Sequence, residues 1–167
     1  MMTTLWPSSA HGADFSSNRK HRFALWRAWD ESKPEVMFIG LNPSTANEEK
    51  NDPTIRKVIK FAVNWGYGSV TMLNLFTYVT TYPEELKTCK NPLLQADVTL
   101  ISYARDADKI IFAWGNFKEA QERAKQVIAM FPNAYCLVKN KDGSPRHPLY
   151  VPGNTEPVPF LTINKEP

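Results

Sequence analysis

Polar residues that could bind a ligand stand directly after apolar runs of this sequence. Asn42 and Asn74 each follow an apolar run, Trp114-Gly115 ends a third, and His147 lies in the loop after a fourth. Short apolar runs bounded by turn residues predict strands buried on both faces, as in a parallel sheet covered by helices. Because ligands bind beyond the carboxyl ends of such strands, we expect these loops to converge on one cleft.

The residue types of this predicted cleft suit recognition of a nucleobase. Side-chain amides read the edge of a heterocycle, aromatic rings stack on its face, and arginine or lysine binds phosphates. The same loops lack a nucleophile elbow, a phosphate loop with G-K-[ST], a G-x-G-x-x-G dinucleotide motif and a metal-ligand cluster. We therefore expect a nucleic acid or nucleotide as the ligand, with no metal and no cofactor.

Helices between the strands must position these loops. Asp52 followed by Pro53 is typical of a helix N-cap with proline in the first turn, and apolar residues then recur at helical spacing up to the glycines of residues 66–68. Further helices are predicted over residues 91–105 and 117–130. The first of these two is expected to bury Leu93, Leu94, Val98, Leu100 and Ile101.

The predicted fold is a single α/β domain over residues 1–167, a three-layer α/β/α sandwich around a mainly parallel four-stranded sheet. Residues 22–29 are expected to add an N-terminal antiparallel edge strand. Residues 1–18 are expected to form a loose N-terminal arm and residues 151–167 an extended C-terminal segment. The four parallel strands, numbered along the chain and with predicted order 2-1-3-4, are residues 36–40, 69–75, 108–114 and 133–138.

Composition narrows the protein class. A chain of 167 residues corresponds to one domain, and its two cysteines are too few for a disulfide framework or a four-cysteine metal site. The sequence shows neither a secretory signal pattern nor an apolar stretch long enough to span a membrane, so we expect a cytoplasmic location. The net charge of +3 is too mild to indicate a nucleic-acid binder by itself. His11 and His21 have no partner at metal-ligand spacing and are expected to be solvent-exposed.

Several motifs resemble a known family. G-L-N-P-S at residues 40–44 resembles the first signature of the uracil-DNA glycosylase superfamily, closest to the G-I-N-P-G of the mismatch-specific uracil/thymine enzymes. M-L-N at residues 72–74 resembles the strand-end asparagine that reads the base edge in classical uracil-DNA glycosylases. I-I-F-A-W-G at residues 110–115 and R-H-P at residues 146–148 resemble the apolar strand and the second signature, H-P-S-P. The chain as a whole is also similar to the bacterial and phage domain-of-unknown-function family 1643, which implies no activity.

The glycosylase resemblance implies a uracil-DNA glycosylase-like fold and a DNA-repair hydrolase that flips a modified or mismatched base from DNA and cleaves its N-glycosidic bond. It implies that Asn42 positions the attacking water and that His147 stabilises charge on the leaving base. Asn74 would read the base edge. The other residues that would contact the base are Gly40, Leu41, Pro43, Ser44, Phe76, Tyr78 and Trp114. Leu149 would occupy the vacated space in the stack, and the phosphates would be bound by Lys139, Lys141 and Arg146.

Departures from the family pattern leave the substrate base open. The second signature reads H-P-L-Y where the superfamily has H-P-S-P, and Ser44-Thr45 replaces residues that usually shape the pocket. Structural interpretations also stay open. Asn42 is a natural turn former, Asn74 fits a buried amide, and Trp114 fits a core residue. Asp52 is either only a helix cap or a carboxylate that assists the water.

Two other functions stay open beside the glycosylase hypothesis. One is a non-catalytic nucleic-acid or nucleotide-binding module of the same fold. The other is an enzyme that acts on free nucleosides or nucleotides. Salt-dependent affinity for DNA would argue against the free-nucleoside enzyme, because phosphate contacts release counterions. DNA and RNA both stay open as the polymer.

Overall fold

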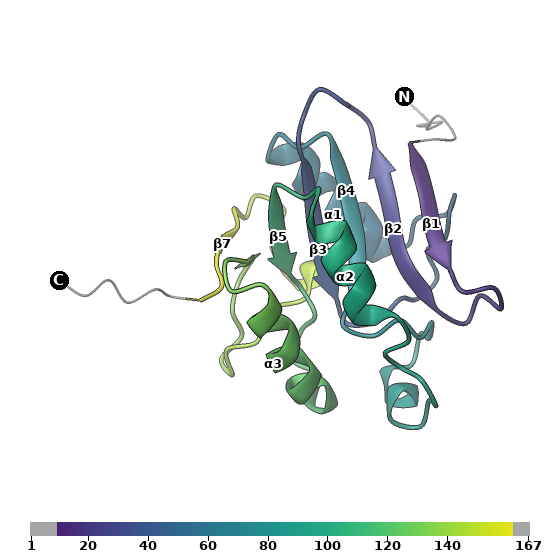
Figure 1. Cartoon of the computed structure of the whole chain (residues 1–167). Coiled ribbons are helices and arrows are strands. Elements are labelled where there is room, and N and C mark those ends of the chain that lie inside the picture. The colour runs from purple at the N-terminus through teal and green to yellow at the C-terminus, as the bar shows by residue number, and fades with distance from the viewer. Residues whose placement is uncertain (1–9, 162–167) are drawn as a thin grey trace.

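The computed structural model describes residues 10–161 as one sheet with helices on both faces (Figure 1). The strands are β1 (His11–Phe15), β2 (Arg22–Ala28), β3 (Glu35–Gly40), β4 (Ser69–Asn74), β5 (Lys109–Phe112), β6 (Tyr135–Cys136) and β7 (Val158–Pro159). The α-helices are α1 (Pro53–Asn64), α2 (Ala96–Ala104) and α3 (Gln121–Met130). Short 3₁₀ helices occur at Pro83–Lys87, Lys118–Ala120 and Pro148–Tyr150.

The sheet has seven strands in the order β1-β2-β4-β3-β5-β6-β7. The pairs β3–β4, β3–β5 and β5–β6 are parallel, whereas β1–β2, β2–β4 and β6–β7 are antiparallel. The mixed α/β class predicted from the sequence is confirmed. The sheet is wider than predicted, because antiparallel strands flank the parallel ones on both sides. β2, predicted as an edge strand, lies between β1 and β4.

The edge position belongs to β1, within the residues predicted to form a loose arm. Its Gly12 lies against the indole of Trp26, and a Cβ on Gly12 would be 2.4 Å from Trp26 Cζ2. Glycine at this position therefore permits the close pairing of β1 with β2. The predicted C-terminal segment contains β7, which pairs with β6. Residues 1–9 and 162–167, the outer parts of both predicted segments, lie outside the described residues.

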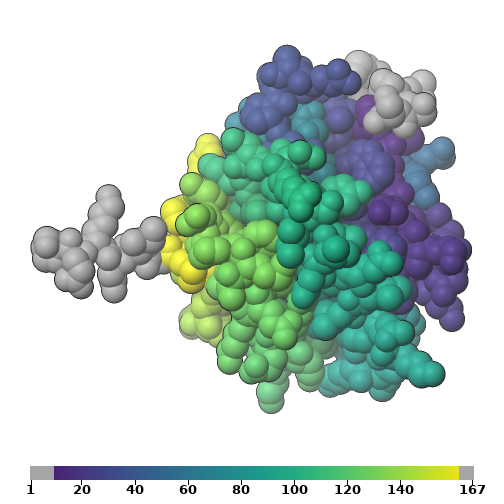
Figure 2. Space-filling model, in the orientation of Figure 1, coloured from purple at the N-terminus to yellow at the C-terminus, as the bar shows by residue number. Residues whose placement is uncertain are grey.

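Alternating side chains of β3 divide the core into two layers. Val36 and Phe38 belong to the apolar cluster that includes residues of α1, whereas Met37 and Ile39 belong to the cluster that includes residues of α2 and α3. Helix α1 thus covers one face of the sheet, and α2 and α3 cover the other. Figures 1 and 2 view the molecule from the side of α2 and α3, whose side chains cover this face.

Helix α2 is shorter than predicted and buries fewer of its apolar side chains. It begins only at Ala96, after Gln95 adopts a left-handed conformation with φ of 54°, because the chain after Pro92 forms a turn. This start places Ala96 and Leu100, four residues apart, on the buried face. Four of the residues expected in the core are exposed as a result: Leu93, Leu94, Val98 and Ile101.

The expected exposure of both N-terminal histidines is wrong. His21 is only 8% exposed, and its Nδ1 lies 3.0 Å from the hydroxyl of Thr77. That hydroxyl donates to the carbonyl oxygen of Leu94, so His21 Nδ1 is the donor in the pair. His11 is half-buried and its Nδ1 donates to the carbonyl oxygen of Glu48 at 2.7 Å. Both rings therefore hold loops onto the sheet.

Candidate functional site

A cavity of about 260 Å³ lies at the carboxyl ends of β3 and β4. Asn42, Asn74 and His147 all line it, although they are widely separated in the sequence. Gly40, Leu41 and Ser44 line it as well. The structure thus brings both amides, the histidine and part of the G-L-N-P-S segment together, at the sheet edge where α/β folds bind ligands.

The side chain of Asn42 joins the loop after β3 to the loop after β4. Its Nδ2 donates to the carbonyl oxygens of Thr80, at 2.7 Å, and of Pro43, at 3.0 Å. The backbone amide of Thr80 in turn donates to the Pro43 carbonyl. Asn42 therefore has a structural role in linking the two loops, through Nδ2 as a donor. Because Nδ2 is engaged, Oδ1 is the atom of this amide that can accept a hydrogen bond from a water or ligand.

Asn74 ends β4 directly beside Gly40, its register partner on β3. The side chain is 6% exposed, and its Nδ2 is enclosed without a hydrogen-bond partner among the described residues. An enclosed donor without an acceptor is rare in native proteins and costs about 1–3 kcal/mol. The Asn74 amide is therefore a donor that a ligand in this cavity can satisfy.

His147 precedes the 3₁₀ turn Pro148–Tyr150, and its side chain caps that turn. The ring Nδ1 accepts a hydrogen bond of 3.2 Å from the backbone amide of Leu149. Burial lowers the pKa of His147, and the negative charge of Asp52 only partly offsets that effect. A neutral imidazole that accepts at Nδ1 carries its proton on Nε2. His147 can therefore donate a hydrogen bond through Nε2.

The W-G turn after β5 supports this histidine. The amide of Gly115 donates to the carbonyl oxygen of Pro145 at 2.8 Å, which joins the two loops. Gly115 has φ of 80°, and a Cβ there would lie 3.8 Å from the Cβ of His147. The glycine is thus required by its left-handed backbone.

Arg22 and Asp52 are cavity-lining residues with charged side chains. Arg22 was not predicted from the sequence. It lies at the start of β2, and its backbone amide donates to Thr77 just beyond β4. Because β2 runs antiparallel to β4, its amino end reaches the edge where the parallel strands end. Asp52 is the N-cap of α1, with Oδ1 accepting from the Ile55 amide at 2.9 Å, so its predicted role as a cap is confirmed.

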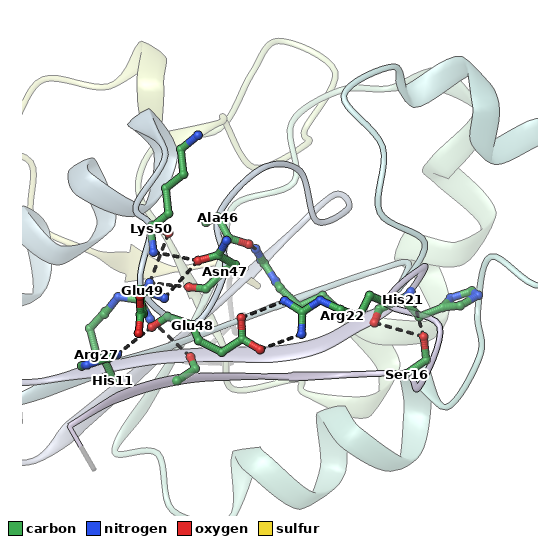
Figure 3. A network of polar contacts seen from close by, with 12 residues as sticks. His11, Ser16, His21, Arg22, Arg27, Ala46, Asn47, Glu48, Glu49 and Lys50 are labelled. Carbon is green, nitrogen blue, oxygen red and sulfur yellow. Dashed lines mark hydrogen bonds and ion pairs between the residues drawn. The ribbon is translucent and has the colours of Figure 1, made fainter. Parts of the chain in front are cut away.

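A polar network holds the loop between this site and α1 against β1 and β2 (Figure 3). Arg27 Nη2 donates to the carbonyl oxygens of Asn47, at 2.6 Å, and of Lys50, at 3.3 Å. Arg22 Nη1 donates to the carbonyl oxygen of Ala46 at 3.2 Å. These bonds fix the segment that leads into Asp52, and so they fix one wall of the cavity.

The predicted stacking rings lie elsewhere. Phe76 and Trp114 are buried in the cluster on the α2 and α3 side, where Trp114 packs against Phe112 at a ring distance of 4.5 Å. Tyr78 contacts His21 edge-on, and Pro43 lies in the loop without lining the cavity. Trp114 is therefore a core residue, in agreement with its structural interpretation. None of these three aromatic residues lines the cavity.

The predicted phosphate-binding loop is partly engaged in its own contacts. Arg146 Nε donates to Asn140 at 3.0 Å, and Lys139 Nζ lies 4.9 Å from the centre of the Phe160 ring. Lys141 is exposed. Leu149, 42% exposed, lines a groove on the outer side of α1. The basic residues of that groove, which the sequence interpretation did not include, are Arg56, Lys57 and Lys60.

Within residues 10–161, no three or more His, Cys, Asp or Glu side chains are grouped so that they could hold a metal ion. None of the helices in the same range combines the length and the apolar character that crossing a membrane requires.

A family model described as "Protein of unknown function (DUF1643)" matches residues 22–149 of the chain. The matched range begins at Arg22 and ends at Leu149, so it includes every residue that lines the cavity. No curated protein and no solved structure matches the chain significantly.

Proposed function

The chain belongs to the DUF1643 family, and from the geometry of its cavity we propose that it recognises a nucleobase and cleaves the N-glycosidic bond of a modified or mismatched base in DNA. The family description names no activity, so the proposal rests on the site. The observation that carries it is the meeting of Asn42, Asn74 and His147 in one cavity. These are the residues to which the resemblance to uracil-DNA glycosylases assigns the water, the base edge and the leaving group.

The chemistry follows from the atoms that each side chain leaves free. Asn42 Oδ1 accepts a hydrogen bond from a water that attacks C1′ of the sugar. The C1′–N bond breaks with its electron pair passing to the base, while the water oxygen bonds to C1′ and releases a proton. His147 donates from Nε2 to the base oxygen on which negative charge develops. Such a donor stabilises the transition state without needing a charged imidazole, which agrees with the lowered pKa of this ring.

Asp52 is the carboxylate on the cavity wall that can receive the water's proton. Its Oδ1 accepts from the Ile55 amide, which leaves Oδ2 for the water. The base nitrogen finally takes up a proton from solvent, so the products are the free base and an abasic sugar. This assignment uses the alternative role that the sequence left open for Asp52.

A DNA strand is proposed to run over the groove of α1. Arg56, Lys57 and Lys60 supply positive charge there, and Leu149 stands two residues from His147 at the same groove. Basic side chains bind phosphates without reading the sequence, and an apolar side chain can occupy the space left by a flipped base. Lys141 adds an exposed positive charge in the loop that leads to His147.

The test is release of base from a panel of oligonucleotides that contain uracil, hydroxymethyluracil, deaminated purines or phage-type modified bases. We expect alkali-labile sites with wild-type protein on at least one substrate, and their loss in Asn42→Ala and His147→Ala. Asn133→Ala, which changes an exposed asparagine in the turn before β6, is the matched control that keeps activity. Binding of the strands without base release would refute the catalytic step and favour the binding module. That module is the second candidate because no predicted stacking ring lines the cavity.

A further inference from the structure

Arg22 is a buried arginine without a neutralising partner. It is 3% exposed, and no ion pair within residues 10–161 includes it. Nη1 donates to Ala46, but Nε is enclosed and has no partner in this part of the chain. Burial lowers its pKa to about 10, against the opposing charge of Asp52. Buried charges are normally paired or bound to a ligand, because removing them from water is costly.

The chain's other buried arginines show what structural arginines look like in this fold. Arg27 is fully buried and donates to Asn51 Oδ1 and to the carbonyl oxygens of Gly12, Trp26, Asn47 and Lys50. Arg123 also has an enclosed Nη2 without a partner among the described residues, but it donates to Leu75 and Gln126 and pairs with Asp97 at 2.7 Å. Arg22 differs from both, since it has one weak hydrogen bond and lines a cavity. The difference indicates a ligand-binding role for Arg22.

We propose that Arg22 and Asn74 together bind an oxyanion carried by the ligand of this cavity. The free edge of the guanidinium is formed by Nε and Nη2, whose parallel N–H groups match the two oxygens of a carboxylate or phosphate. Asn74 Nδ2 is a second enclosed donor without an acceptor on the same cavity. Both orphan donors are therefore explained by one ligand group that offers several acceptor oxygens.

The inference rests on the proposed function for the rest of the ligand and specifies its substrate class. A cavity of about 260 Å³ is smaller than the roughly 300–1,000 Å³ typical of sites for drug-sized ligands, so it admits a single ring with a small substituent. A base with an acidic substituent fits within this volume, whereas only a part of a nucleotide, such as its phosphate, can lie inside it. Asp52 lies on the same wall, and its negative charge repels an anion and so limits the affinity for it.

Calorimetric titration distinguishes these ligands. The probes are uracil-6-carboxylate for the carboxylate, deoxyuridine monophosphate for the phosphate, and uracil and deoxyuridine as their neutral counterparts. We expect wild-type protein to bind one anionic probe at least tenfold more tightly than its neutral counterpart, and the better probe identifies the source of the oxyanion. Asp52→Asn keeps a capping oxygen and removes the negative charge, so it should tighten anion binding.

Arg22→Met tests the residue itself. It should abolish the preference for the anionic probe while the melting temperature stays equal to or above that of wild type, because a buried unpaired charge is replaced by an apolar side chain. Arg22→Lys keeps the positive charge but lacks the two parallel N–H groups, so it should lose at least half of the gain in affinity for the anionic probe over its neutral counterpart. This variant also tests the proposal if Arg22→Met does not fold. Arg105→Gln, at the exposed C-terminal end of α2, is the control with unchanged binding.

Equal affinity of wild type for anionic and neutral probes, or the absence of binding to all of them, overturns the oxyanion proposal. A lowered melting temperature in Arg22→Met with an unchanged preference overturns it too, since Arg22 would then be structural. These outcomes are independent of base release. A protein that releases neutral bases without preferring anions would retain the proposed glycosylase function and lose this inference.

Discussion

The α-carbon of Gly40 faces the side-chain amide of Asn74 across two neighbouring strand ends. A Cβ on Gly40 would lie 2.7 Å from Asn74 Oδ1 and 2.6 Å from Met72 Cε. The glycine that begins the G-L-N-P-S segment thus leaves room for the amide of the next strand. This contact connects the two motifs in three dimensions, because the position of the Asn74 donor depends on the absence of a side chain at residue 40.

Gly40→Ala should therefore displace the Asn74 amide. We expect a loss of stability of about 1–3 kcal/mol, as for other insertions into packed sites, together with at least a tenfold loss of ligand affinity. Denaturant unfolding and calorimetry measure the two effects. Gly153→Ala is the matched control, since a Cβ there meets nothing within 4 Å. Unchanged ligand affinity in Gly40→Ala would contradict the role assigned to the Asn74 amide.

Asn42→Ala should destabilise the protein as well as remove activity. The substitution removes the donor to the Pro43 and Thr80 carbonyls, and the expected cost is about 1–3 kcal/mol. Asn42→Asp separates the two roles, because it keeps an acceptor for the water but loses Nδ2. Thermal unfolding should show both variants below wild type by a similar margin. A variant as stable as wild type would mean that the loops are held together without this side chain.

Lower pH should destabilise the folded state through His147. Burial lowers its pKa in the folded protein, so between that pKa and the unfolded value near 6.5 the unfolded chain binds more protons. Stability should consequently fall as pH drops below about 6.5 and be unaffected by this group above it. His147→Gln should reduce the slope of unfolding free energy between pH 7 and pH 5. His21, whose pKa burial also lowers, contributes to the slope in the same direction.

Glu35 should give folding stability the opposite dependence on pH. Burial, with a smaller contribution from the negative charge of Asp106, raises its pKa from 4.5 to about 7. Between these values the folded state binds more protons, so stability decreases as pH rises through this window. Glu35→Gln should remove that decrease in a series of melting temperatures from pH 4.5 to pH 8. Glu35 begins β3, at the end of the strand opposite Gly40, and ligand binding should not change.

The residues that follow the parallel strands could be predicted from the sequence, because one simple rule places the ends of such strands. Apolar runs of β-strand length predicted β3 and β4, and parallel strands bring their carboxyl ends to one edge, where the structure places Asn42, Asn74 and His147. Arg22 was missed because this rule considers only the carboxyl ends of parallel strands, whereas Arg22 lies at the amino end of the antiparallel strand predicted over residues 22–29. The exposed side of α2 was missed because apolar spacing does not show where a helix begins.

Phe76 and Trp114 were predicted to contact the base, but the direction of their side chains keeps them out of the cavity. Phe76 and Trp114 follow strands that end at the site, but their side chains point into the opposite apolar cluster. Trp114 has the parity of Phe112, which packs in the same cluster, whereas Phe76 lies beyond the end of β4, where the alternation of the strand no longer applies. Sequence position beside a site therefore predicts which residues lie at an edge more reliably than it predicts which of them contact the ligand.

Glycosylase activity is measured most simply as the amount of free base released in a single turnover from a duplex with one modified base. We expect one base and one abasic site per duplex with wild-type protein, and no release with Asn42→Ala or His147→Ala that remain folded. Release that is unchanged in both folded variants would contradict the assigned site. No release by wild type from any modified duplex would contradict the assigned reaction.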